Sequence, residues 1–271
     1  AQILWVRFLI FVPIALALGV GGMGYLFLSG NGAVLLALPQ RMMAGVDQFI
    51  LLTIPLFLLA GMLMNVGGIT DRIVEFARAM VGHRRGGLSS VTVLSAGFFA
   101  GISGSATAEA SALGSILIPT MARQGIPKAY AAALVGVSSI MGPIIPPSIT
   151  MIIFGVLSGV SIGQLFIAGV MPGILLALGL LIYAGWRARR DGFPITEKMG
   201  WADRRRATVR TLPALILPLI IVVGIKAGVF TPTEAAAVAV VYALIIGFAY
   251  RDLTIPRVWQ SLVATCFVSA S

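Results

Sequence analysis

Residues 129–186 read AYAAALVGVSSIMGPIIPPSITMIIFGVLSGVSIGQLFIAGVMPGILLALGLLIYAGW and contain no Asp, Glu, Lys or Arg. A helix needs about 20 apolar residues to cross the hydrocarbon core of a bilayer, so this stretch predicts two crossings joined by an uncharged turn. The first crossing is interrupted by Gly142-Pro-Ile-Ile-Pro-Pro-Ser148. Each proline removes a backbone donor and clashes with the preceding helical turn. We therefore expect a broken transmembrane helix over residues 123–161 and a continuous one over residues 162–186.

Charge is scarce along the whole chain. Of its 271 residues, 59% are hydrophobic and only 10% are charged, whereas an average soluble domain is about a quarter charged. Long uncharged segments also cover residues 8–40, 48–70, 86–108 and 235–250. This pattern excludes a soluble protein and predicts an all-α integral membrane protein whose residues 1–67 form the N-terminal transmembrane helices.

The net charge of +10 comes from Lys and Arg residues in short connections between apolar segments. That placement is the one the positive-inside rule describes. Because no basic face with interleaved aromatic residues is present, no nucleic-acid partner is expected. Residues 187–210 carry eight basic residues and are predicted to form a cytoplasmic loop.

Two segments between the apolar runs have patterns of their own. Within residues 68–86, apolar residues recur at helical spacing opposite a charged face, which predicts an amphipathic arm helix lying in the membrane interface. Residues 87–122 have small and hydroxyl residues at their centre and basic residues on both flanks. Equal flanks imply entry and exit on one side of the membrane, so we expect a re-entrant helical hairpin with a polar tip. Non-helical backbone at membrane depth must be buried in protein or line a wet cavity.

The hairpin tip and the helix break are the candidate site. Unwound carbonyls and helix C-termini can coordinate a cation, while helix N-termini face an anion. Hard oxygen ligands suit an alkali cation better than a transition metal. Small residues also serve simply to let helices pack closely, but two such clusters, one at a tip and one at a break, favour a site. We assign sodium binding to Ser103, Gly104, Ser105, Ser138, Ser139 and Gly142, and the substrate cavity to Thr107, Pro143, Pro146, Pro147 and Ser148. No carboxylate pair lies at either place, and Glu109 alone is close to the tip.

Four motifs occur in order along the chain: Phe98-Phe-Ala-Gly-Ile-Ser-Gly-Ser-Ala106, Ala112-Leu-Gly-Ser-Ile-Leu-Ile-Pro119, Gly142-Pro-Ile-Ile-Pro-Pro-Ser148 and Phe230-Thr-Pro-Thr-Glu-Ala-Ala-Ala237. Together they resemble the large membrane (M) subunit of tripartite ATP-independent periplasmic (TRAP) transporters. The resemblance implies an elevator-type, inverted-repeat fold, in which the chain supplies the first repeat and, with residues 211–271, the start of the second.

The same resemblance implies function and partners. It implies sodium-coupled uptake of small organic anions such as C4-dicarboxylates or sialic acids, with sodium as the coupling ion and no other cofactor. The expected partners are a small membrane (Q) subunit and a soluble periplasmic binding protein, and the expected location is the bacterial inner membrane. Family members are longer than this chain, whose C-terminal end precedes a second hairpin and a second broken helix, so a truncated chain is expected.

Two alternatives stay open on the sequence: a divalent-anion/sodium symporter of another elevator family, and a membrane scaffold subunit that transports nothing itself. An intramembrane enzyme is not expected, because the single histidine, His83, lies outside the apolar segments and no buried base faces a serine.

Overall fold

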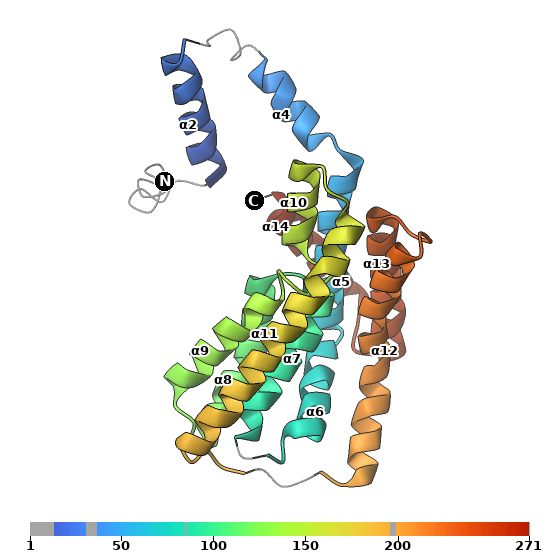
Figure 1. Ribbon diagram of the computed structural model, residues 1–271. Coiled ribbons are helices and arrows are strands. Elements are labelled where there is room, and N and C mark those ends of the chain that lie inside the picture. The colour runs from blue at the N-terminus through green and yellow to red at the C-terminus, as the bar shows by residue number, and fades with distance from the viewer. Residues whose placement is uncertain (1–13, 31–36, 85, 196–198, 271) are drawn as a thin grey trace. The chain divides into compact units, whose positions relative to one another are not determined.

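The computed structural model describes residues 14–30, 37–84, 86–195 and 199–270, and every element within these ranges is a helix (Figure 1). The all-α prediction is therefore confirmed for this part of the chain. The chain divides into two units, residues 1–48 and 49–271. The first unit contains α2 (Ile14–Leu28) and α4 (Leu38–Val46). Transmembrane helices were expected within residues 1–67, of which residues 1–13 and 31–36 lie outside the described ranges.

The second unit contains the segments in which the site was predicted. Its elements are η1 (Phe49–Leu52), α5 (Thr53–Val66), α6 (Ile69–Val81), α7 (Gly87–Ser103), α8 (Ala106–Arg123), α9 (Lys128–Ser138), η2 (Ser139–Met141), α10 (Ile149–Ser158), α11 (Ile162–Arg190), α12 (Trp201–Lys226), α13 (Pro232–Ala249) and α14 (Ile255–Ala270).

Within the described residues, four helical segments are long and apolar enough to cross a membrane: Phe49–Val66, Ile162–Arg190, Trp201–Lys226 and Pro232–Ala249. Their mean hydropathy over 18 residues lies between 1.8 and 2.6, and about 20 such residues are needed for a crossing. These helices fit a multi-pass membrane protein.

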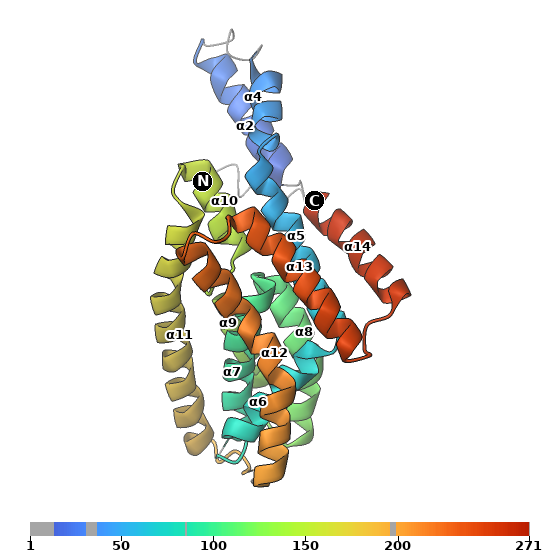
Figure 2. The same ribbon diagram turned by 90° about the vertical axis from the view of Figure 1, so that its right-hand side faces the viewer.

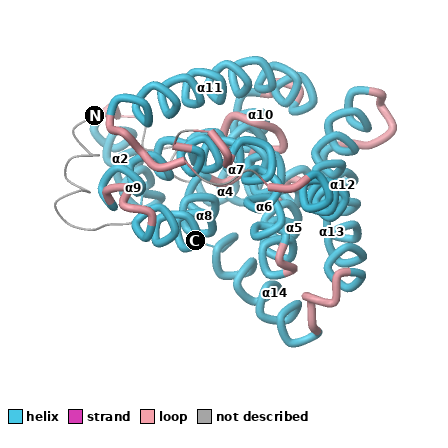
Figure 3. The backbone as a smooth tube through the Cα atoms, turned by 90° about the horizontal axis from the view of Figure 1, so that it is seen from below, coloured by secondary structure: helices cyan, strands magenta, loops and turns pink. Residues whose placement is uncertain are grey.

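Helix α7 forms the centre of the second unit. It packs against α5, α6, α8, α9 and α11, and the view along the helices in Figure 3 places it among them. Fourteen of its 17 residues are buried. Many of these are Gly, Ala, Ser or Thr, which allow neighbouring helices to approach closely. The predicted hairpin is thus a helix pair whose first arm is enclosed by protein.

Helix α6 runs from Ile69 to Val81, inside the segment 68–86 for which the amphipathic pattern predicted a helix. Its apolar residues Ile69, Ile73 and Ala77 are fully buried, and the helix packs against α7 and α12. The apolar face is therefore covered by protein, where the sequence suggested contact with the membrane interface.

The predicted loop over residues 187–210 is shorter than expected. Helix α11 extends to Arg190 and α12 begins at Trp201, so only residues 191–200 connect them. Basic residues are favourable at a helix C-terminus, where the helix dipole is negative, and Arg187, Arg189 and Arg190 occupy the last turn of α11. The boundary assigned from charge alone was wrong for this reason. The cytoplasmic location of the connection stays a prediction.

Helix α13 begins with a capping box. The Thr231 hydroxyl accepts a hydrogen bond from the Glu234 backbone N–H, and the Glu234 carboxylate accepts one from the Thr231 backbone N–H. This reciprocal pairing satisfies donors that a helix start leaves free. Below the cap, α13 packs along α5, where the buried hydroxyls of Thr53 and Thr233 lie 2.8 Å apart in a hydrogen bond.

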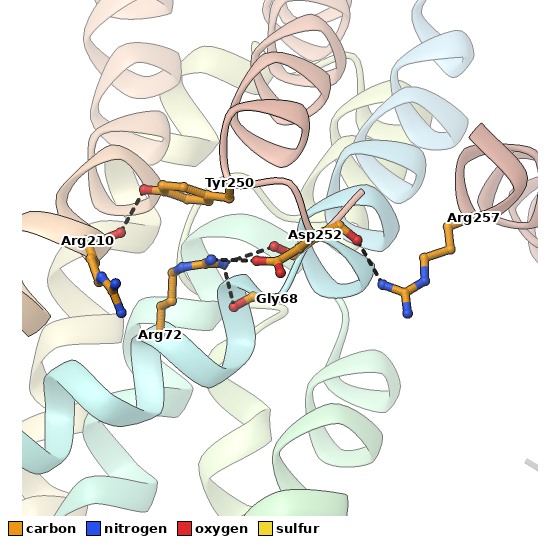
Figure 4. Close-up of polar contacts among 7 residues, drawn as sticks. Gly68, Arg72, Arg210, Tyr250, Asp252 and Arg257 are labelled. Atoms are coloured by element: carbon orange, nitrogen blue, oxygen red, sulfur yellow. Dashed lines mark hydrogen bonds and ion pairs between the residues drawn. The ribbon is translucent and has the colours of Figure 1, made fainter. Parts of the chain in front are cut away.

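Arg72 connects the start of α6 to the segment between α13 and α14 (Figure 4). Its guanidinium donates to the carbonyl oxygens of Gly67 and Gly68, at 3.1 and 3.0 Å, and forms an ion pair with Asp252. It also lies over the Tyr250 ring, 4.0 Å from the centroid. One planar cation therefore holds two helix ends that are far apart in sequence.

These contacts predict unequal effects of removing the two partners of the ion pair. Arg72→Met removes two carbonyl hydrogen bonds, the ion pair and the cation–π contact, and should cost about 2–3 kcal/mol. Asp252 has a side chain 42% exposed, so Asp252→Asn should cost about 1 kcal/mol or less. Thermal unfolding of the full-length protein in detergent measures both. The control is Arg78→Met on the same helix, and a midpoint that falls as far for Arg78→Met as for Arg72→Met would contradict the assignment.

Candidate functional site

The hairpin reverses direction within two residues. Helix α7 ends at Ser103, and Gly104 has a φ of +59°, a conformation that glycine adopts without steric cost. Ser105 then caps α8, since its hydroxyl accepts from the Ala108 backbone N–H. The same hydroxyl lies 3.1 Å from that of Thr107. The tip is therefore a tight turn lined with hydroxyl groups.

The break in the next helix is a turn closed by a serine. The Ser148 hydroxyl accepts from the Met151 backbone N–H at 3.3 Å and donates to the Pro143 carbonyl at 2.7 Å. The peptide bond between Pro146 and Pro147 is cis. In this part of the structure, the carbonyl oxygens of Gly142, Pro146 and Pro147 receive no hydrogen bond. The prediction of two half-helices with unwound backbone between them agrees with this geometry.

The tip packs directly on the break. The backbone N–H of Ile149 donates to the carbonyl oxygen of Gly104 at 3.4 Å. A Cβ atom built on Gly104 would lie only 2.5 Å from the Pro147 carbonyl oxygen and 3.2 Å from the Ser148 Cα. Gly142 makes the second close approach, because a Cβ atom there would lie 3.2 Å from the Ala106 nitrogen. Two clusters some 40 residues apart in the sequence thus meet at one place.

Helix ends of both polarities converge at this contact. The Pro146 carbonyl oxygen lies 3.6 Å from a Cβ position on Gly101, in the last turn of α7. Unpaired carbonyls from the break therefore face a helix C-terminus, which carries partial negative charge and favours a cation. The N-termini of α8 and α10 begin beside them, and helix N-termini favour an anion. The arrangement has the electrostatic features of an ion-coupled binding site.

Glu109 is a residue of this site that the sequence assignment left out. It is fully buried, and neither of its carboxyl oxygens has a hydrogen-bond partner among the described residues. Its Oε2 atom lies 2.9 Å from a Cβ position on Gly142, so the carboxyl group lies against the helix break. A buried charge without a partner is strongly unfavourable. The signal was present in the sequence, since Glu109 is the only acidic residue between Glu75 and Asp191.

The remaining assigned residues differ in their surroundings. Ser103 is buried, and its Cα lies 3.2 Å from a Cβ position on Gly61 of α5. The Ser138 hydroxyl is buried without a hydrogen-bond partner within the described ranges. The Ser139 hydroxyl instead donates to the Val135 carbonyl at 2.9 Å, so it is already engaged within its own helix. Thr107 is exposed and marks the open edge of the site.

The close contact at Gly104 predicts that one added methyl group lowers stability more at this glycine than at a glycine without close neighbours. Gly104→Ala combines an unfavourable backbone conformation, costing roughly 1–2 kcal/mol, with a collision against the Pro147 carbonyl. Gly159→Ala is the matched control, because Gly159 has a similar φ of +71° but no atom within 4 Å of its Cβ position. Thermal unfolding in detergent should show a clearly lower midpoint for Gly104→Ala than for Gly159→Ala. Equal midpoints would mean that the tip does not press on the break.

One protein family matches the chain over nearly its whole length. The family described as "Tripartite ATP-independent periplasmic transporter, DctM component" matches residues 2–271.

Similar proteins include the 2,3-diketo-L-gulonate TRAP transporter large permease protein YiaN of Escherichia coli, which is 42% identical over 93% of this chain and 59% of its own length. The C4-dicarboxylate TRAP transporter large permease protein DctM of Rhodobacter capsulatus is 38% identical over 96% of this chain and 62% of its own. The sialic acid TRAP transporter large permease protein SiaM of Vibrio cholerae is 38% identical over 96% and 61%. The chain thus spans about three-fifths of the length of these curated relatives.

Proposed function

The chain belongs to the DctM family of TRAP transporters, and on that premise we propose that it acts in the sodium-coupled uptake of small organic anions across the bacterial inner membrane. Membership confirms the family suggested by the four sequence motifs. It also agrees with the expectation that the protein is a transporter component and not an enzyme, and it removes the alternative of a symporter from another elevator family.

The sodium site in this proposal lies between the hairpin tip and the helix break. The observation that carries it is the contact of Gly104 with Pro147 and Ser148, beside which the Glu109 carboxyl has no partner among the described residues. Sodium bound there would compensate a buried carboxylate and receive free carbonyl oxygens from the break. The hydroxyls of Ser103 and Ser105 lie at the tip. Together with the buried Ser138 hydroxyl, which has no partner among the described residues, they are the further hard oxygen ligands in this proposal.

Coupling follows if sodium orders the tip against the break. The anion would then find its cavity already formed, at the edge marked by Thr107 and the N-termini of α8 and α10. By thermodynamic reciprocity, the anion must strengthen sodium binding by the same factor. The three relatives are named for diketogulonate, a C4-dicarboxylate and sialic acid, which share a carboxylate group. We propose a carboxylate of this kind as substrate, delivered by a periplasmic binding protein to a complex that includes a small membrane subunit.

An elevator-type fold with inverted repeats is part of the proposal. Its support is that α5 and α6 precede the hairpin as an apolar span followed by a short amphipathic helix, and that α13 and α14 repeat this order. The two apolar helices α5 and α13 pack on each other, as corresponding members of two related repeats would. Residues 211–271 then begin the second repeat.

The sodium dependence of uptake tests the site. In the full-length transporter reconstituted with its partners, Glu109→Gln removes the charge and keeps the size, and it should raise the half-saturating sodium concentration at least tenfold, roughly the effect of losing one charge-assisted contact. Ser105→Ala should raise it less. The control is Ser158→Ala, since that hydroxyl donates to the Phe154 carbonyl at the far end of α10.

Three results would count against the proposal. Uptake that does not depend on sodium would remove the coupling ion, and variants indistinguishable from the parent would remove the assigned site. A parent complex that assembles but transports no carboxylate would favour the remaining alternative, a membrane scaffold subunit.

A further inference from the structure

A cavity lies at the opposite end of α7 from the hairpin tip. It has a volume of about 770 Å³ and is formed by the end of α6, the start of α7 and the last third of α11. These three segments lie together at the lower end of the unit in Figures 1 and 2. The cavity is separate from the proposed ion site and has a different lining.

Most of the side chains that line the cavity are apolar. Leu178, Leu181 and Ile182 line it from α11, and Val81 lines it from α6. Leu178 and Ile182 are 51% and 73% exposed. Since α11 is one of the helices long and apolar enough to cross a membrane, these side chains lie where lipid acyl chains would contact the helix.

The mouth of the cavity is cationic. Arg84, between α6 and α7, and Arg189, in the last turn of α11, both line it. Both residues are exposed, and neither guanidinium forms an ion pair or hydrogen bond with any residue the structure describes. Their neighbours differ. Arg187 is paired with Asp191 at 2.7 Å, and Arg190 lies over the Trp186 ring at 5.4 Å. The mouth therefore presents two uncompensated guanidinium groups.

Trp186 indicates the level of the membrane–water interface at this mouth. It lines the cavity one turn beyond Ile182 and just before Arg189. Tryptophan is enriched at membrane–water interfaces, where its ring lies at headgroup level. The order along α11 is thus apolar, then aromatic, then cationic, which is the order of acyl chain, interface and headgroup.

We propose that this groove binds an anionic phospholipid, with an acyl chain along Leu178 and Ile182 and the phosphate between Arg84 and Arg189. Guanidinium groups bind phosphate through paired, charge-assisted hydrogen bonds. Basic pockets beside transmembrane helices are a recognised way of holding acidic lipid headgroups. The two unpaired positive charges favour an anionic lipid over a zwitterionic one, and the apolar interior favours a lipid over a soluble phosphate.

Lipid binding to the purified full-length protein tests this proposal. Native mass spectrometry with added phosphatidylglycerol should show bound lipid in the parent, and with phosphatidylcholine much less. The double variant Arg84→Gln/Arg189→Gln should bind phosphatidylglycerol roughly 10- to 30-fold more weakly, as the loss of two surface charges implies. The control Arg206→Gln/Arg210→Gln makes the same change of net charge on α12 and should bind as the parent does.

Further arms separate the alternatives. Arg84→Lys/Arg189→Lys keeps both charges and should retain most binding, so a loss in the Gln variant with retention in the Lys variant cannot come from misfolding. Equal binding of the two lipids by the parent, or equal phosphatidylglycerol binding by both double Gln variants, would overturn the proposal. Competition by inorganic phosphate at the lipid's own concentration would also overturn the proposal, because it would identify the groove as an anion site. Displacement of the lipid by the small membrane subunit would overturn it too, because it would identify the groove as a subunit interface.

Discussion

The contact between Gly104 and the Pro147–Ser148 backbone is the constraint on which the rest of the structure depends. In the proposed re-entrant arrangement, the hairpin tip and the proline-rich break lie at membrane depth, where no water satisfies backbone polar groups, yet both leave the helical hydrogen-bond pattern. The two segments pack on each other, and serine side chains satisfy backbone groups in both of them. Ser105 and Ser148 cap the helices that restart, and glycines at 104 and 142 let the two irregular segments come close enough to exclude lipid.

This arrangement places carbonyl and carboxyl oxygens without hydrogen-bond donors close together where the tip meets the break. The carbonyl oxygens of Gly142, Pro146 and Pro147 receive no hydrogen bond in this part of the structure, and the Glu109 carboxyl is buried beside them without a partner within the described chain. In the proposal made above, a bound sodium ion would compensate the Glu109 carboxylate and coordinate free carbonyl oxygens of the break, so the irregular backbone would be the source of its affinity. The C-terminal end of α7, Ser103, lies at the proposed site. Near the start of the same helix, Ser90 lines the apolar groove whose mouth is cationic.

Much of this arrangement follows from the sequence because prolines, glycines and charges act locally. The presence of a helix within residues 68–86, the tip near Gly104 and the break at residues 142–148 can all be read from residue types. The ends of α11 and α12 could not, because Arg187 to Arg190 are equally compatible with a loop and with a favourable helix C-terminus. The burial of Glu109 could not be read either, since it depends on Gly142, 33 positions later, packing against α8. The sequence also did not show that other parts of the protein cover the apolar face of α6, because that covering depends on α12.

Amide hydrogen exchange in the full-length protein tests the central claim most directly, because it reports the ordering of the tip and the break separately from transport. Exchange is compared in sodium chloride and in choline chloride at equal ionic strength. The account predicts that sodium slows exchange in peptides covering both residues 100–110 and residues 140–150, while the start of α9, residues 128–135, exchanges equally in the two salts. Equal exchange of the tip and break in both salts, or slowing in one of them alone, would contradict an ion site formed by their contact.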